Sequence, residues 1–311
     1  MATLPKHLLT LEEFSSKELL GLLVLAGKIK KTPKRYQKAL DEKCLAMIFD
    51  KSSTRTRVSF DVGMTQLGGR ALFLNGHELQ LGRGEPLPDT AKVLSRYVQG
   101  IMIRTFAHET VEELAKHSSV PVINGLTDTH HPCQVLADLQ TIREHFKKLK
   151  GLQLVYVGDG NNMAHSLMIG AAKTGMHCRI VCPMDYQPDA AILKIAKKEG
   201  EKSGSRIEVT QRIQGSVRGA NVVYTDVWTS MGQEVESKKR LNDFQEFQVN
   251  EKLMAESPKA IFLHCLPAHR GEEVSAGVMD GKQSRVWDQA ENRLHAQKAL
   301  LVTLMGSGGK K

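Results

Sequence analysis

The amino-acid sequence predicts an α/β fold with two domains, each a parallel β-sheet flanked by helices on both faces, joined by interdomain helices. Length is the first reason, because 311 residues suit two domains of ordinary size. The second reason is that short apolar runs alternate with longer amphipathic segments along the chain. Consecutive parallel strands need a crossover long enough to hold a helix, so this alternation favours parallel sheets covered on both faces.

The individual elements follow in order from the same pattern. Ser15 and Glu18 have the spacing of a capping box, so the first helix is expected to begin there and to run to about Lys31. Strands are expected at residues 44–49, 100–103, 120–123, 152–157, 178–182, 221–224 and 260–264. Further helices are expected at residues 54–67, 89–97, 110–117, 134–149, 163–174, 189–199 and 291–305.

The predicted domain boundary lies on the helix at residues 134–149, directly ahead of a new strand. The first domain then spans residues 1–133, and the second spans residues 150–290. We expect the last helix, at residues 291–311, to return to the first domain.

The net charge of +9 raises the question of nucleic-acid binding, since Lys and Arg neutralise phosphates. The basic residues are scattered, however, in short groups such as 28–38, 147–150 and 238–240. Aromatic residues make up only 5% of the chain, so no stacking platform for bases is indicated. We interpret the basic groups as solvated faces and expect no nucleic-acid partner, although the positive charge can still attract small anions.

The cysteine content favours a reducing compartment, because five cysteines are an odd number without the dense spacing of a disulfide framework. The N-terminal segment MATLPKHLL lacks the basic and apolar regions of a secretion signal. The apolar run at residues 19–26 is far shorter than the ~20 residues that span a bilayer. We therefore expect a cytoplasmic protein without membrane attachment.

The segment KSSTRTR, residues 51–57, follows the first predicted strand and opens a helix. In open α/β sheets, ligands bind beyond the carboxyl ends of strands, where helix N-termini offer free amide donors and a positive partial charge. Ser53 and Thr54 can cap the helix and bind a phosphate, while Arg55 supplies two parallel donors. The segment therefore predicts a site for a small dianion, and the alternative is a capped helix whose arginines face solvent.

Polar residues also follow later strands. Arg104 comes directly after a predicted strand, where an arginine must find an anion or reach solvent. HHPCQ, at residues 130–134, opens a helix and places His131 and Gln134 near its N-terminus, and HCLP, at residues 264–267, follows another strand. A lone histidine of this kind is usually structural, but three polar clusters at strand ends favour a functional role.

Five segments together resemble, in order and spacing, the signature segments of the ornithine carbamoyltransferases, a branch of the aspartate/ornithine carbamoyltransferase superfamily. They are STRTR at residues 53–57, HPCQ at 131–134, DVWTSMG at 226–232, HCLP at 264–267 and ENR at 291–293. The resemblance spans nearly the whole chain. It implies that the first domain binds carbamoyl phosphate and that the second binds ornithine.

The resemblance also implies a set of site residues. Those implied for carbamoyl phosphate are Ser53, Thr54, Arg55, Thr56, Gln80, Arg104, His131, Gln134, Cys265, Leu266 and Arg293. Those implied for ornithine are Asn162, Asp226, Ser230 and Met231. The implied catalytic residues are Arg104, His131, Cys265 and Arg293. Arg57 would either contact the ligand or hold the loop by a salt bridge.

The implied reaction is attack by the neutral δ-amine of L-ornithine on carbamoyl phosphate, giving L-citrulline and phosphate in arginine biosynthesis or a urea-cycle-type step. The residue types agree with this acceptor, because ammonium groups favour Asp226 and Ser230, whereas an aspartate acceptor would need arginine or lysine there. Putrescine or a modified ornithine is the alternative acceptor. Gln80 is implied to reach the site of a neighbouring subunit, so a homotrimer or a multiple of trimers is expected. The direction, anabolic or catabolic, stays open.

Two other classes of site are less well supported. VYVGDGNNM follows a strand and opens a helix, but Met163 stands where a dinucleotide-binding fingerprint needs a third glycine. Cys133 lies two positions from His131, and Cys265 is adjacent to His264, whereas paired zinc ligands are usually separated by two to four residues. We expect no cofactor and no catalytic metal, although a soft metal ion can bind the Cys265 thiolate.

Overall fold

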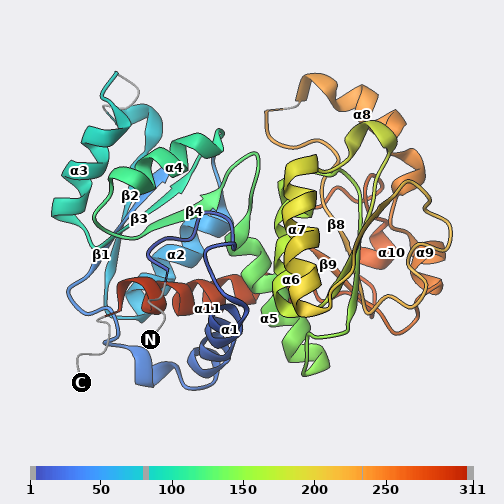
Figure 1. Ribbon diagram of the computed structural model, residues 1–311, viewed down its shortest axis with the longest axis horizontal. Helices are drawn as coiled ribbons and strands as arrows, with labels where there is room; N and C mark the ends of the chain where they lie inside the picture. The colour runs from blue at the N-terminus through green and yellow to red at the C-terminus, as the bar shows by residue number, and fades with distance from the viewer. Residues whose placement is uncertain (1–4, 80–83, 233, 307–311) are drawn as a thin grey trace. The chain divides into compact units, whose positions relative to one another are not determined.

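The computed structural model of this chain describes residues 5–79, 84–232 and 234–306 (Figure 1). These residues form two compact units. Unit 1 contains the residues up to Gln140 together with those from Glu291 onward, and unit 2 contains Thr141–Ala290. Both boundaries fall inside helices, in α5 (Pro132–Phe146) and in α11 (Val286–Met305). The last helix therefore contributes most of its length to unit 1.

Unit 1 is built around a parallel sheet with the strand order β2-β1-β3-β4. Its strands are β1 (Cys44–Phe49), β2 (Arg70–Asn75), β3 (Gly100–Arg104) and β4 (Val122–Leu126). Its helices, besides parts of α5 and α11, are α1 (Ser16–Lys31), α2 (Thr54–Gln66), α3 (Leu87–Tyr97) and α4 (His108–His117). Helices α3 and α4 pack on one face, against Ile48 of β1 and Ile101 of β3, while α1, α2 and α11 lie on the other face (Figure 1).

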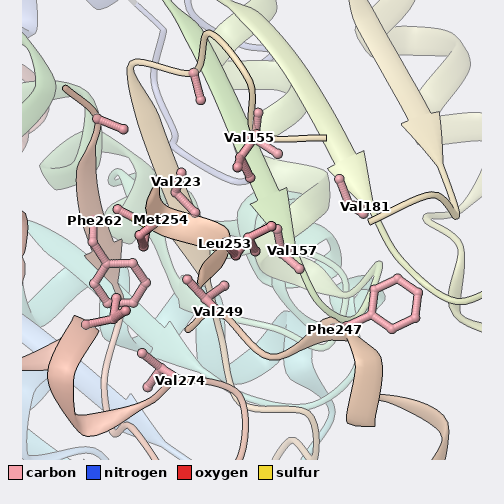
Figure 2. Packing of buried hydrophobic residues seen from close by; sticks show 14 of the residues in the cluster. Val155, Val157, Val181, Val223, Phe247, Val249, Leu253, Met254, Phe262 and Val274 are labelled. Atoms are coloured by element: carbon pink, nitrogen blue, oxygen red, sulfur yellow. The ribbon is translucent and has the colours of Figure 1, made fainter. Parts of the chain in front are cut away.

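Unit 2 holds a second parallel sheet, with the strand order β7-β6-β5-β8-β9. Its strands are β5 (Gln153–Val157), β6 (His177–Val181), β7 (Ile207–Thr210), β8 (Val222–Thr225) and β9 (Ile261–His264). Its helices include α6 (Asn162–Thr174), α7 (Ala190–Ser203), α8 (Ser237–Asp243), α9 (Glu251–Ala255) and α10 (Ala276–Met279). On one face, Val155 of β5 and Val223 of β8 pack with Val249 and Leu253 (Figure 2). Helices α6 and α7 cover the opposite face (Figure 1).

The predicted fold class is confirmed, since both units are parallel sheets with helices on both faces. The sequence pattern missed β2 and β7, which are both edge strands. Each is partly exposed along its length, so neither shows the continuous apolar run of a strand buried on both faces. The short helices α8, α9 and α10 were not predicted either, because they are too short for a clear helical period.

Several helix boundaries differ from those expected, for example in α5 and α11. Helix α5 ends at Phe146, ahead of the predicted residue 149, and Lys147 takes the left-handed conformation with φ of 62°. Helix α11 begins at Val286, which is earlier than the predicted residue 291. Within residues 5–79, 84–232 and 234–306, no helix combines the length and apolar character needed to cross a membrane.

The predicted capping box at α1 is confirmed and provides a test of local stability. The Ser15 hydroxyl accepts a hydrogen bond from the Glu18 N–H at 3.3 Å, and the Glu18 carboxylate accepts one from the Ser15 N–H at 2.8 Å. Replacing Ser15 by alanine is expected to lower the free energy of unfolding by about 1 kcal/mol. Urea denaturation followed by circular dichroism measures the change. Ser16→Ala, at the exposed first residue of α1, is the control, and an equal loss in both variants would contradict the capping role.

Candidate active site

The N-terminus of α2 forms the first part of the candidate site, where the sequence predicted an anion site. Strand β1 ends at Phe49, and the chain turns into α2 at Ser53. The Ser53 hydroxyl accepts a hydrogen bond from the Thr56 N–H at 3.2 Å and donates one to the Thr56 hydroxyl at 3.1 Å. Thr54 is exposed and Arg55 is half-buried beside it. The first turn therefore offers hydroxyls, a guanidinium and the positive end of the helix dipole.

A buried chain of hydrogen bonds connects α2, α5 and α11. Arg293 of α11 donates to the Gln134 side-chain oxygen at 2.7 Å and to the Thr56 hydroxyl at 3.3 Å. Gln134 donates in turn to the Asp138 carboxylate at 2.8 Å. With the Gln297 amide oxygen turned toward the guanidinium, Arg293 also donates to it at 2.9 and 3.2 Å. Arg293 is thus held at several points in one orientation, as a residue that must meet a ligand precisely requires.

His131 lies in the same unit, at the turn between β4 and α5, and it is buried. Burial is the main reason that the pKa of His131 lies well below its ordinary value. Three positive charges lower this pKa further, those of Arg293, Arg104 and Arg55. The imidazole is therefore neutral at pH 7, and three guanidinium groups concentrate positive charge around it. Such an arrangement favours a small anion over a neutral or cationic ligand.

Arg57, whose role the sequence left open, is directed to another partner. Its guanidinium lies over the ring of Phe73 in β2, 3.8 Å from the ring centroid. Lys51, the first residue of the KSSTRTR segment, is buried and forms an ion pair with Asp128 in the loop before His131. This ion pair ties the loop after β1 to the loop after β4, and so helps to hold the two parts of the anion site together.

In unit 2, Asp226 is the focus of the residues predicted for the amino-acid substrate. It follows β8 and is buried. One carboxylate oxygen accepts from the Cys265 thiol at 2.8 Å and from the Val227 N–H at 2.8 Å, while the other accepts from the Asn161 side chain at 3.3 Å. Three donors therefore fix this carboxylate in place, where it can accept a hydrogen bond from an ammonium or amine group.

The remaining predicted residues lie near Asp226 in the chain or in neighbouring loops of unit 2. Asn162 is the first residue of α6 and is half-buried. Ser230 is half-buried and Met231 is exposed, in the segment after Asp226. Leu266 follows Cys265 and takes a left-handed conformation with φ of 62°. Gln80, the residue implied to reach a neighbouring subunit, lies outside the described residues.

Two residues of unit 2 that support this site were missed by the sequence analysis. Asn161 caps α6 by accepting from the Met163 and Ala164 N–H groups, and it also orients Asp226. A capping asparagine at a strand-to-helix turn is a signal that could have singled it out. Arg240 was interpreted as part of a solvated basic run at residues 238–240, and that interpretation is wrong.

Arg240 is buried because it has internal partners. Its guanidinium donates to the Asp159 carboxylate at 2.7 Å and to the Trp228 carbonyl at 3.0 Å. Burial is the main cause that raises the pKa of Asp159 to about 6, against the opposing effect of Arg240. Trp228 lies between Asp226 and Ser230 in the chain. The hydrogen bond from Arg240 to the Trp228 carbonyl therefore helps to hold in place the segment that carries both predicted substrate residues.

Side chains that could bind a metal ion lie close together in two places within the part of the chain that the structure describes. Asp226, His264 and Cys265 place one possible ligand atom each within 4.8 Å of one another, and so do His269, Glu272 and Glu273. In the first group the Cys265 thiol already donates to Asp226. The Cys265 thiol is the soft ligand to which, from the sequence, we expected that a metal ion can bind.

Two family models match the chain, and both describe the aspartate/ornithine carbamoyltransferases. The model of the carbamoyl-P binding domain matches residues 6–144, and the model of the Asp/Orn binding domain matches residues 150–304.

Individual proteins of known identity match over nearly the same length. The ornithine carbamoyltransferase of Oceanobacillus iheyensis is 59% identical over 303 residues, which cover 96% of this chain and 94% of that protein. Among solved structures, ornithine carbamoyltransferase from Pyrococcus furiosus superposes with a TM-score of 0.94 at 51% identity, covering 99% of this chain and 98% of that one. The anabolic ornithine carbamoyltransferase from Campylobacter jejuni gives 0.91 at 43% identity, with 96% and 98% covered. The chain therefore belongs to the aspartate/ornithine carbamoyltransferase family.

Proposed function

We propose that this protein is an ornithine carbamoyltransferase, which transfers the carbamoyl group of carbamoyl phosphate to the δ-amine of L-ornithine and releases L-citrulline and phosphate. The observation that carries the carbamoyl phosphate part of the proposal is the buried His131 with the charges of Arg293, Arg104 and Arg55 around it. The similar proteins from Oceanobacillus iheyensis and Pyrococcus furiosus bear the same name, which supports ornithine as the acceptor. The product makes arginine biosynthesis the natural pathway.

Unit 1 supplies the groups that suit carbamoyl phosphate. The first turn of α2, with Ser53, Thr54 and Arg55, would bind the phosphate group and stabilise it as it leaves. Thr56, Arg104, His131 and Arg293 would donate to the carbonyl oxygen, which becomes an oxyanion as the amine attacks. Gln134 would accept from the carbamoyl amide and hold Arg293. Positioning and electrostatic stabilisation then account for the rate, with no covalent intermediate.

Unit 2 supplies the groups that suit ornithine. Asp226 and Ser230 would bind its ammonium and amine groups, and Asn162 with the Met231 backbone would bind its α-carboxylate. The Cys265 thiol, already hydrogen-bonded to Asp226, would orient the δ-amine. The backbone of Cys265 and Leu266 is also proposed to contact the carbamoyl amide.

The reaction is tested directly by incubating the purified protein with carbamoyl phosphate and ornithine and measuring both products. The proposal predicts citrulline and phosphate in equal amounts. Phosphate release without citrulline would indicate hydrolysis and would contradict the transfer reaction.

The pH dependence gives a further prediction. The δ-ammonium of ornithine resembles that of lysine, with a pKa of ~10.4, so only about one amine in a thousand is neutral at pH 7. Because the neutral amine is the nucleophile, kcat/KM for ornithine is expected to rise as pH increases from 6 to 9. The neutral state of His131 across this range means that its ionisation does not oppose the rise. A rate that falls steadily over the same range would argue against attack by the free amine.

We also propose that the protein assembles as a homotrimer or a multiple of trimers. Edge strand β2 carries the exposed apolar side chains of Leu72 and Phe73, 43% and 41% exposed, and α2, which packs against β2, carries exposed Val58 and Val62. Exposed apolar side chains on a sheet edge suit a contact between protein chains. Light scattering after size exclusion tests this, and a mass equal to one chain would contradict it.

We propose that each of the two substrates binds to its own domain. Residues 1–133 with 291–311 would form the carbamoyl phosphate domain, residues 150–290 the ornithine domain, and residues 134–149 the connecting helix. Two compact units and two matched family models support this division.

A cytoplasmic location is proposed because the partly exposed Cys265 thiol is part of the site and would be kept reduced there.

A further inference from the structure

The loop after β9 is closed by a buried carboxylate. Glu273 and His264 both have fully buried side chains. One oxygen of Glu273 accepts a hydrogen bond from the His269 backbone N–H at 2.6 Å and lies 3.2 Å from the His264 Nε2 atom. The carboxylate thus contacts the first and last residues of the segment 264–269, which contains Cys265 and Leu266.

The hydrogen bonds of the His264 ring determine which nitrogen carries the proton. Its Nδ1 atom accepts from the Leu266 backbone N–H at 2.9 Å. A ring nitrogen that accepts has no proton, so the hydrogen lies on Nε2 and is donated to Glu273. The His264 backbone N–H donates to Gln289 at 3.0 Å, and Gln289 donates to the Tyr224 hydroxyl at 3.0 Å. The ring and its backbone are therefore both held in place.

The bond from Leu266 to the His264 ring stabilises an unfavourable backbone. Leu266 has φ of 62°, in the left-handed region that a leucine rarely adopts. Cys265 lies between the two residues, and its thiol donates to Asp226 at 2.8 Å. The orientation of the Cys265 thiol and of the Leu266 backbone therefore depends on the acceptor nitrogen of His264.

We propose that His264 is a positioning residue for the carbamoyl transfer reaction, held in one tautomer by Glu273 so that its Nδ1 atom fixes the backbone of Cys265 and Leu266. The inference rests on the proposed function, because those two residues are proposed substrate contacts. His264 itself touches neither substrate. Its effect is transmitted through the geometry of the loop, as for supporting residues of other sites.

Two substitutions separate the two hydrogen bonds of the ring. The side-chain oxygen of asparagine lies where Nδ1 lies, so His264→Asn keeps the acceptor for Leu266 and loses the donor to Glu273. The side-chain nitrogen of glutamine reaches the place of Nε2, so His264→Gln keeps the donor and loses the acceptor. The proposal predicts that His264→Gln lowers kcat/KM for ornithine at least tenfold more than His264→Asn does, with similar melting temperatures.

A matched control is available in His177, at the start of β6. Its Nδ1 atom also accepts a backbone N–H, that of Arg206 at 3.1 Å, but this bond lies away from the proposed substrate residues. His177→Gln is expected to leave kcat and both KM values unchanged. Equal losses of activity in His264→Gln and His264→Asn would overturn the positioning role.

A neutron crystal structure of the unaltered protein tests the tautomer without any variant. The proposal predicts deuterium on Nε2 of His264 and none on Nδ1. Deuterium on Nδ1 would overturn it, whatever the kinetics show. If the unaltered protein makes no citrulline, the proposed function fails, and the neutron result still decides the structural part of the inference.

Discussion

Replacing Arg293 by lysine is expected to lower kcat/KM for carbamoyl phosphate by about a hundredfold or more, the size of effect that follows loss of an oxyanion donor. Lysine keeps the positive charge but lacks the planar fork that donates to Thr56 and Gln134 at once. Charge alone would leave the carbonyl oxygen without a fixed donor. Steady-state kinetics with varied carbamoyl phosphate and saturating ornithine measure the loss.

The control for this prediction is Arg285→Lys. Arg285 lies just before α11 and donates to the backbone carbonyls of Lys282 and Ser284. Because it lies outside the proposed site, its replacement is expected to change kcat/KM by less than about twofold. Thermal unfolding of both variants separates a catalytic effect from a folding defect. Near-normal kcat/KM in a folded Arg293→Lys protein would contradict the proposed role of the guanidinium fork.

Replacing Asp226 by asparagine is expected to lower kcat/KM for ornithine by about a hundredfold, because a charge-assisted hydrogen bond to the substrate contributes roughly 1.5–3 kcal/mol. Asparagine has almost the same shape and retains an oxygen that can accept from Cys265 and Val227. Its amide nitrogen loses only the 3.3 Å hydrogen bond from Asn161, so the loop should keep its path. The binding of carbamoyl phosphate should change little, because its proposed phosphate site lies in unit 1. Varying each substrate in turn distinguishes the two effects.

Asp243 offers a matched control for the charge change. It lies at the end of α8 and accepts a hydrogen bond from the Tyr186 hydroxyl at 2.7 Å, at an exposed position. Asp243→Asn is expected to leave both substrate KM values unchanged. If Asp226→Asn instead raised KM for carbamoyl phosphate and left that for ornithine unaltered, the assignment of Asp226 to the amino-acid substrate would be wrong.

The interior of both sheets was predictable because their central strands are buried on both faces. Strand β1, for example, is the apolar run CLAMIF and is buried at every position. The edge strands β2 and β7 could not be predicted in this way, because a partly exposed strand need not be apolar along its whole length. Their strand state comes from pairing with β1 and β6, which a local sequence window does not contain.

The candidate site shows a similar division. Ser53 was found because its motif lies between a strand end and a helix N-terminus, where ligands bind in parallel sheets. Asp226 was identified only by the resemblance of DVWTSMG to a carbamoyltransferase segment. The roles of Arg240 and of the His264 tautomer could not be predicted from the sequence. Arg240 depends on its contact with Asp159, and His264 on its contact with Glu273, and both contacts arise only in the fold. From sequence alone, Arg240 is one basic residue in an ordinary charged run.

The acceptor specificity of the purified protein tests the central claim most directly. Carbamoyl phosphate is supplied with ornithine, putrescine, N-acetylornithine, lysine or aspartate in turn, and carbamoylated product and phosphate are both measured. We predict efficient turnover with ornithine and little with the others, because Asp226 and Ser230 suit ammonium groups while Asn162 and the Met231 backbone suit an α-carboxylate. Preference for putrescine or another amine would contradict the proposed ornithine site, and no turnover with any acceptor would contradict the proposed activity as a whole.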